Sequence, residues 1–373
     1  MTDIREPHGR PEEHHAQATA RRAVTEGAGR RAVAEGMARW AAGNGALPHF
    51  LFRPEEPGAT LLLSGERGVM VQVVRRTEPN AWAVREQAWL AEQVAAAGRR
   101  LDQGWVGRQW FGSERGGRVE VDPAAVTWSG VLLVDHPALP PGVQLVREAA
   151  RGPLVVFLRR DWELLLHELR SAAAVVRCLD WLAGRVPGEE VPAHFAWLTV
   201  AADLPARMPA GPLPEMPLLV DDLPGHAVIS RMLEYVAAGS LDEAVRHRLL
   251  SLIDGFPLEH RAGLGDWAAE AIHAGGAARV RTFSFPGSRC QYVLAVAGSF
   301  SEALAGPFDD LVQLRHHEAR KRSLSTFGFV LVPDAAQPGW PYLIAHFTWV
   351  QGPVDLTPDD LSRIRTIWSD LPS

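Results

Sequence analysis

The stretch from Leu61 to Val74, LLLSGERGVMVQVV, constrains the fold of this chain more than any other part of its sequence. Two apolar runs flank the small and charged residues Ser64 to Gly68, a pattern that predicts two strands joined by a tight turn. The second run is mostly valine, and one polar residue, Gln72, stands inside it. A strand that is apolar on both faces is typical of the centre of a sheet, so we expect this strand to be central in a mixed sheet.

Apolar periodicity predicts further elements on both sides of this hairpin. In the first half we expect a helical segment over 16–42, strands over 49–53, 60–63, 69–75, 130–134 and 154–158, and helices over 81–97 and 161–182, the last capped by Asp161. In the second half we expect helices over 226–238, 241–253, 264–274, 308–321 and 356–371, a hairpin of strands over 280–284 and 291–297, and strands over 327–332 and 342–348. Because strands and helices mix without strict alternation, the fold class is α+β or mixed α/β.

Pro and Gly residues become frequent between the two halves and indicate a junction. The expected organisation of the 373 residues is a polar arm at 1–15, a first domain at 16–185, a junction at 186–224 and a mixed α+β domain at 225–373.

Composition excludes several classes of function. A net charge of −6 gives no overall field that attracts nucleic acid. The two cysteines, Cys178 and Cys290, are too few for a disulfide framework and form no zinc motif. We find no signal-type segment and no apolar run of about 18 residues, so we expect a cytoplasmic protein without a membrane partner.

Roughly residues 20–185 resemble the nuclease-related domain and its restriction-endonuclease-like kin, the PD-(D/E)XK proteins. That family runs helix, three-strand meander, helix, strand, which matches the order of elements expected from 16–42 to 130–134. The segment PLVVFLRRDWELL from Pro153, followed by a long helix, is also similar to bacterial nuclease-like proteins. The resemblance implies a restriction-endonuclease-like core in the first half of the chain.

The resemblance also implies where a nuclease site would stand. Glu35 would be the acid of the first helix, Glu66 the acid at the turn, Gln72 the acid of the second strand, and Val74 the lysine. Such sites hold Mg²⁺ with carboxylates, and a glutamine carbonyl is a weaker ligand because it carries no charge. Valine neither polarises water nor neutralises phosphate, so the site is degenerate.

Two nearby arginines are poor replacements for the missing lysine. Alternation along the strand places Arg75 on the opposite face from Val74. Some family members carry the lysine on the following helix, where Arg85 is the nearest substitute here. Arginine stays protonated and is a poor base.

Two functional hypotheses therefore remain open. The first is a non-catalytic nuclease-fold protein that acts by binding, such as a subunit of a bacterial defence or DNA-handling system, without a cofactor. The second is an active nuclease with a migrated site, and only this alternative requires Mg²⁺. For the first we expect a protein partner rather than nucleic acid. The simplest interpretation of Glu66 is an exposed turn residue, and that of Gln72 is a core amide with its hydrogen bonds satisfied.

The basic run LRHHEARKR contains the best candidate binding surface, formed by Arg315, Arg320, Lys321 and Arg322. Four cations on about two helical turns are suited to a phosphate or to an acidic protein face.

Two further motifs contain residues able to bind metals or take part in catalysis. His316 and His317 are adjacent on an expected helix, where their rings diverge by about 100°, so they predict no metal site. Asp135 and His136 follow an expected buried strand, and strand ends of open sheets are common places for site residues.

Overall fold

The computed structural model describes residues 49–54, 59–75, 82–103, 107–113, 118–136, 139–140, 146–183, 223–274, 278–285, 290–319, 325–333 and 342–368. These residues form two compact units, one before and one after the segment 184–222, and each unit packs helices on a mixed sheet. The chain is therefore a mixed α/β protein. The arm expected at 1–15, the helical segment expected over 16–42 and most of the expected junction lie outside the described residues.

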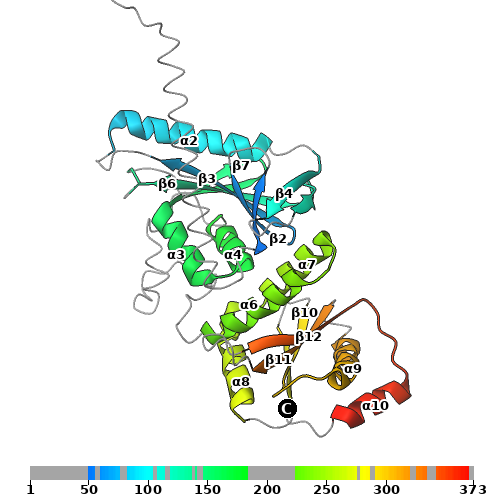
Figure 1. Ribbon diagram of the computed structural model, residues 1–373. Helices are drawn as coiled ribbons and strands as arrows, with labels where there is room; N and C mark the ends of the chain where they lie inside the picture. Colours follow the sequence, from blue (N-terminus) through cyan, green and yellow to red (C-terminus); the bar gives the residue numbers. More distant parts are fainter. Residues whose placement is uncertain are drawn as a thin grey trace, which may run out of the picture. The chain divides into compact units, whose positions relative to one another are not determined.

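The described strands of the first unit pair in the order β5-β4-β1-β2-β3-β6-β8-β7. Figure 1 shows this sheet, with β2, β3, β4, β6 and β7 labelled. Their bounds are β1 Leu51–Pro54, β2 Thr60–Ser64, β3 Arg67–Arg75, β4 Gln109–Ser113, β5 Arg118–Val121, β6 Thr127–Asp135, β7 Val146–Ala149 and β8 Gly152–Leu158. Strands β1, β2 and β3 are antiparallel to their neighbours in the meander, whereas β3, β6 and β8 are parallel. The central position of β3 in a mixed sheet confirms the prediction from its apolar sequence.

The β2–β3 hairpin closes with a two-residue turn. Ser64 pairs with Arg67, and between them Gly65 has a φ of 60°, a value that costs glycine little because it has no Cβ. This geometry sets the register of β3, and the parallel pairing then aligns Arg67 with Thr127 and Arg75 with Asp135.

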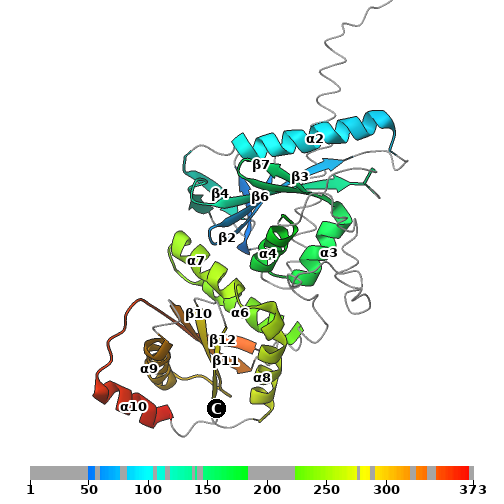
Figure 2. The same cartoon turned by 180° about the vertical axis from the view of Figure 1, so that it is seen from behind.

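Helices cover both faces of this sheet (Figures 1 and 2). Helix α2 (Val84–Gln103) lies on one face, where Val74, Leu90, Val94 and Leu132 belong to one buried cluster. Helices α3 (Arg159–Leu169) and α4 (Ala172–Ala183) lie on the other face. Parallel strands that are covered on both sides need apolar residues on both sides, which is why β6 and β8 carry almost continuous apolar runs.

The long helix expected over 161–182 is two helices, so that prediction is wrong in one respect. Arg170 has a φ of 49°, and its N–H donates to the Leu166 carbonyl to end α3. The Ser171 hydroxyl then accepts the N–H of Ala174, as an N-cap does for a new helix. Apolar spacing continues across this break, so periodicity alone did not detect it.

The expected helix start also needs correction. Helix α3 begins at Arg159, and Asp161 lies buried in its first turn instead of capping it. The helical spacing of apolar residues over 161–182 also predicts one buried face, and this prediction is confirmed, because its five leucine and valine residues are buried: Leu165, Leu166, Leu169, Val176 and Leu179. Strands β4, β5 and β7 were not expected, and each of them is short and has exposed residues.

The described strands of the second unit form a sheet in the order β12-β11-β10-β9. Their bounds are β9 Arg279–Ser284, β10 Cys290–Val296, β11 Ser325–Pro333 and β12 Tyr342–Gln351. Strands β9 and β10 form the expected hairpin, and β10 is parallel to β11. All seven residues of β10 are buried, as befits a central strand.

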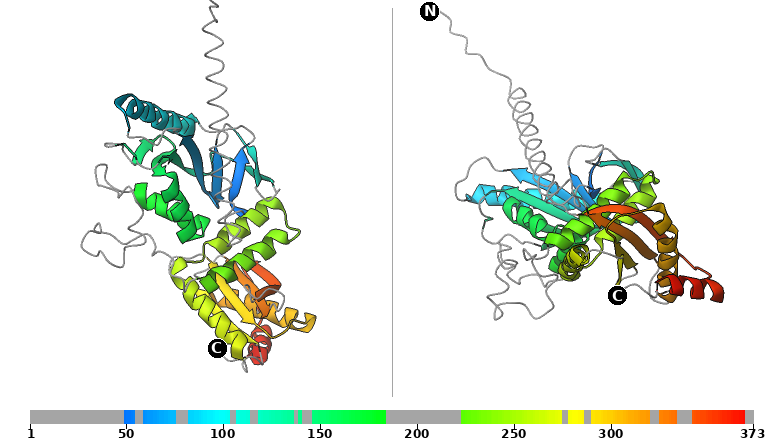
Figure 3. Two further views of the ribbon diagram at one scale, coloured as in Figure 1. Left: turned by 60° about the vertical axis from the view of Figure 1, so that its left-hand side comes forward. Right: turned by 60° about the horizontal axis from the view of Figure 1, so that its bottom comes forward.

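Helices pack on both faces of this second sheet as well (Figure 3). Their bounds are α6 Leu223–Ala238, α7 Glu243–Asp254, α8 Arg261–Ala274, α9 Glu302–Ala319 and α10 Pro358–Trp368, with a short 3-10 turn η4 at Leu258–His260. An aromatic cluster that includes Phe256, Phe283 and Tyr292 fills the α6–α8 side. On the other side Val293, Phe308 and Ile364 belong to an apolar cluster beneath α9 and α10.

We predict that Leu169→Ala destabilises the first unit by roughly 2–5 kcal/mol, because a buried leucine that is truncated leaves a cavity. Urea unfolding of the full chain gives this free energy, and Val84→Ala on the solvent side of α2 is the matched control, since Val84 is 83% exposed. Equal losses for the two variants would contradict the packing described for α3.

Candidate functional site

Gln72 lies on the face of β3 that α2 covers, and its side chain is buried. Its amide nitrogen donates to the Ala97 carbonyl at 3.3 Å and to the Met70 sulfur at 3.4 Å. Its carbonyl oxygen accepts a hydrogen bond from the Arg100 guanidinium at 3.1 Å. Both ends of the amide therefore have partners in the protein, which is the simpler of the two interpretations from the sequence.

Val74 lies two residues further along the same face, in the buried cluster with Leu90 and Val94 of α2. Helix α2 runs back along β3, so its C-terminal half covers Gln72, and Arg100 rather than Arg85 reaches that side chain. Arg85 lies exposed in the first turn of α2, about 22 Å along the helix from Arg100 at 1.5 Å per residue. The partner of Gln72 was therefore missed because the sequence pattern does not give the direction of a helix over its sheet.

Glu66 is exposed in the β2–β3 turn. Its backbone carbonyl accepts the Thr127 N–H, and its neighbour Arg67 pairs with Asp180 of α4. Gln72 lies about 17 Å from Arg67 at 3.4 Å per residue of strand. The structure thus places Glu66 in the turn before β3 and Gln72 in the second half of β3, and does not bring them together. Glu35 lies outside the described residues.

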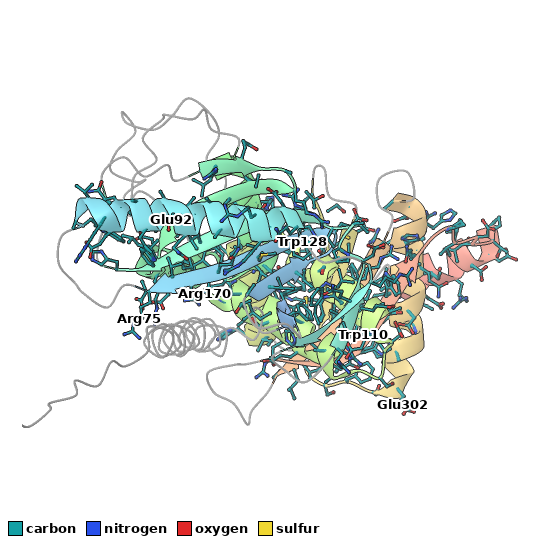
Figure 4. The ribbon with its side chains drawn as sticks, turned by 90° about the horizontal axis from the view of Figure 1, so that it is seen from above. Arg75, Glu92, Trp110, Trp128, Arg170 and Glu302 are labelled. Atoms are coloured by element: carbon teal, nitrogen blue, oxygen red, sulfur yellow. The ribbon has the colours of Figure 1, made fainter. Side chains whose placement is uncertain are left out.

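Charged residues meet instead at the carboxyl ends of the three parallel strands. Asp135 at the end of β6 lies 3.5 Å from the Arg75 guanidinium of β3 and 3.6 Å from that of Arg159, which follows β8. Arg159 also donates to Glu163 at 2.8 Å. We name Arg75, Asp135, Arg159 and Glu163 the carboxyl-edge cluster. Figure 4 shows Arg75 at the end of β3.

All four members of the carboxyl-edge cluster reach solvent. Arg75 is 46% exposed, and the other three side chains are between 24% and 30% exposed. Next to the cluster, the His136 ring lies 4.8 Å from the Trp82 ring that precedes α2. Asp135 and His136 were expected at a strand end, and this edge brings them beside two arginines and an aromatic ring.

The tryptophans Trp110 and Trp128, both labelled in Figure 4, lie in different environments. Trp128 is buried, and its indole N–H donates to the Pro123 carbonyl. Trp110 on β4 is 49% exposed, opposite Glu120 of β5. Trp110 is thus a large aromatic side chain on the open surface of the first unit.

The histidine pair of the second unit is structural. The two ring nitrogens of His316 lie 2.9 Å from the Thr326 hydroxyl and 2.6 Å from the Gly352 carbonyl, and a His317 ring nitrogen lies 2.9 Å from the Val354 carbonyl. Both histidines therefore hold the segment after β12, and their different partners agree with the expected divergence of the rings.

In the basic run, the described member of the expected binding surface is Arg315, and its charge is already paired with an acidic side chain. Arg315 pairs with Glu318 at 2.9 Å, and Glu318 also pairs with Arg365 at 3.2 Å. The other three residues of the expected binding surface, Arg320, Lys321 and Arg322, lie outside the described residues.

A buried polar cluster that was not expected joins α6, α7 and α8. Arg261 is fully buried, and its guanidinium donates to the Asp254 and Phe256 carbonyls and to the His226 ring. The buried Tyr292 hydroxyl donates to the Leu252 carbonyl at 2.8 Å, and burial raises the pKa of Tyr292 well above its ordinary value. These contacts satisfy polar groups inside the core, so the cluster serves the packing of the three helices.

Three observations bear on the class of protein. Among the described residues, no group of three or more His, Cys, Asp or Glu side chains is arranged to hold a metal ion. Within the same residues, no helix is long and apolar enough to cross a membrane. Compared with known proteins, the chain matches no family model, no curated protein and no solved structure with significance.

We predict that Arg100→Ala destabilises the first unit by about 0.5–1.5 kcal/mol, because the buried Gln72 carbonyl loses its donor. In Gln72→Leu the same arginine substitution has a smaller effect, since no acceptor remains to be satisfied. Urea unfolding of the two single variants and the double variant measures this coupling. Additive losses would show that the hydrogen bond contributes nothing.

We predict that His247 on α7 makes the second unit sensitive to acid. Burial lowers the pKa of His247 from its ordinary value of 6.5 to about 4. Between these values the unfolded chain binds a proton that the folded chain does not, so stability is lost as the pH falls from 6.5 towards 4. The measurement is the drop in the urea midpoint between pH 7 and pH 4.5. This drop is smaller in His247→Gln than in the natural chain, and an equal drop in both would contradict the prediction.

Proposed function

We propose that the first unit is a nuclease-like scaffold that acts by binding a protein partner and does not cleave nucleic acid. The order of elements supports the scaffold. The meander β1–β2–β3 is followed by α2, and β6 then lies parallel beside β3, as the family order requires.

The observation that carries the proposal is the environment of Gln72. Both polar ends of its amide are engaged by α2, through Ala97 and Arg100, and Val74 is packed against the same helix. A metal ion or a water nucleophile at this face would require α2 to give up packed apolar side chains. The positions that resemble the catalytic acid and lysine therefore serve the core.

The carboxyl-edge cluster is the surface that we propose for binding. It lies where the ends of parallel strands commonly hold ligands, and its guanidinium groups are partly exposed. Arginine forms paired hydrogen bonds with carboxylates, so an acidic side chain of a protein partner suits Arg75 and Arg159. Asp135 pairs with both arginines in the free protein, and the partner would compete with it.

One observation favours the alternative of a nuclease with a migrated site. Asp135 and Glu163 both contact Arg159, so two carboxylates lie on either side of one guanidinium. Such a site would need Arg159 to move away so that Mg²⁺ replaces it between the carboxylates.

We predict that the purified chain, supplied with Mg²⁺ or Mn²⁺, leaves single-stranded and double-stranded DNA uncut, because Gln72 and Val74 cannot complete a metal site. A gel assay of labelled DNA over hours is the measurement, with Asp135→Asn and Glu66→Ala as variants. Metal-dependent cleavage that Asp135→Asn abolishes would establish the migrated site, and cleavage that Glu66→Ala abolishes would restore the site that the resemblance implies.

The same preparation separates protein partners from nucleic acid. With a net charge of −6, we expect no binding of a short duplex or of single-stranded DNA at physiological salt, and any binding at low salt to weaken steeply. Fluorescence anisotropy at both salt concentrations makes this comparison. Binding that survives physiological salt and is lost in Arg75→Ala would place nucleic acid at the carboxyl edge.

A further inference from the structure

We infer that α10 is a detachable helix that covers an apolar surface of the second unit, and that this surface binds amphipathic helices of the same pattern. The surface, named here the α9 groove, is the part of the apolar cluster around Phe308 and Leu311 of α9; Ile364 of α10 belongs to the same cluster, and the Trp368 ring lies 6.5 Å from the Phe308 ring. Helix α10 is its occupant in this structure, and α9 is its main neighbour. The inference is independent of the function proposed for the first unit.

The contacts of α10 lie at the surface of the unit. Of its eleven residues only Ile364 is buried, and Trp368 is half-buried with its indole N–H donating to the Pro307 carbonyl at 3.0 Å. Ile367, about one turn after Ile364, lies outside the apolar cluster and is 45% exposed. By comparison, every residue of β10 is buried, so the sheet does not depend on α10 as it depends on its central strands.

Two charge pairs also join α10 to α9. Arg363 pairs with Asp310 of α9 at 2.6 Å, and Arg365 pairs with Glu318 of α9 at 3.2 Å. The two arginine side chains are 53% and 62% exposed. Pairs this exposed are weak and are screened by salt, so α10 is held by contacts that a competitor can replace.

Helix α10 carries its own start signal and does not need α9 to begin. The Thr357 hydroxyl accepts the Asp360 N–H at 3.2 Å, and the Asp360 carboxylate accepts the Thr357 N–H at 3.1 Å. The Thr357 hydroxyl also donates to the Asp360 carboxylate at 2.7 Å, and this hydrogen bond, together with that from the Thr357 N–H, lowers the pKa of Asp360. Pro358 occupies the first helical position. All these signals are local and remain intact when the helix leaves the groove.

The hinge lies just before this cap. Gly352 and Val354 are held against α9 by His316 and His317. The helix beyond is held by Ile364, Trp368 and the exposed ion pairs. Detachment therefore moves α10 about the residues between Val354 and Thr357 and leaves the preceding strand in place.

The pattern of α10 defines what the groove accepts. Leu361, Ile364 and Trp368 follow the spacing i, i+3, i+7 of a helix that lays one face in a groove. The arginines beside them face the carboxylates of Asp310 and Glu318. A partner of this groove is thus an amphipathic helix with a basic flank.

The test uses the full chain and a synthetic peptide of residues 354–368 as the probe. In the variant Ile364→Ala/Trp368→Ala the groove is vacated, and the labelled peptide binds it at least tenfold more tightly than it binds the natural chain. Ile367→Ala is the matched control and behaves as the natural chain, because Ile367 is 45% exposed and lies outside the apolar cluster. Peptide affinity for the vacated groove falls about three- to tenfold on raising the salt to about 1 M.

Hydrogen exchange shows whether the rest of the unit stays folded. In the vacated variant the amides of 360–368 exchange faster, while those of β10 and β11 do not change. Faster exchange throughout β10 and β11 would overturn the inference, because α10 would then be part of the core. Failure of the peptide to bind a variant in which only α10 has detached would overturn it as well.

Discussion

The parallel pairing of β3, β6 and β8 is the constraint on which the first unit depends. Parallel strands cannot be joined by a tight turn, so the chain must cross over the sheet between β3 and β6, and α2 makes most of that crossing. The crossover covers one face, and α3 and α4 after β8 cover the other. Apolar residues are then required on both faces of the central strands, and any polar residue there must find its partners inside the protein.

Gln72 shows how strongly this constraint acts. An amide buried without hydrogen bonds costs stability, and α2 supplies one backbone acceptor and one guanidinium donor at this position. A carboxylate in the same place would also be able to pair with Arg100. Whether a polar residue at this position is catalytic or structural therefore depends on its own chemistry. It depends as much on the groups that the following helix places opposite it.

The sequence predicted the elements with strong local signals and missed what depends on tertiary context. Apolar runs located β3, β6, β8 and β10, because buried strands need such runs wherever they pair. The break at Arg170 was missed because apolar spacing continues through it, although Ser171 is a residue type that favours caps. The partner of Gln72 was also missed, since only the direction of α2 over the sheet brings Arg100 to it. Asp135 was singled out correctly as a strand-end residue. Its two arginine partners lie at the end of β3 and at the start of α3, and no local pattern identifies them.

Three buried polar side chains in the two units have their hydrogen-bond partners inside the protein, and this limits where function can reside. Gln72 is engaged by α2, Arg261 by carbonyls of its own unit, and His316 by Thr326 and Gly352. These groups already have hydrogen-bond partners inside the protein. A ligand that displaced those partners would lower the stability of the fold. The polar side chains that exchange partners at less cost are those that reach solvent, in part at the carboxyl edge of the first sheet and more fully between α9 and α10. Both places suit reversible association, because their ion pairs are weak and screened by salt, so water or a competing side chain replaces either partner with little change in free energy.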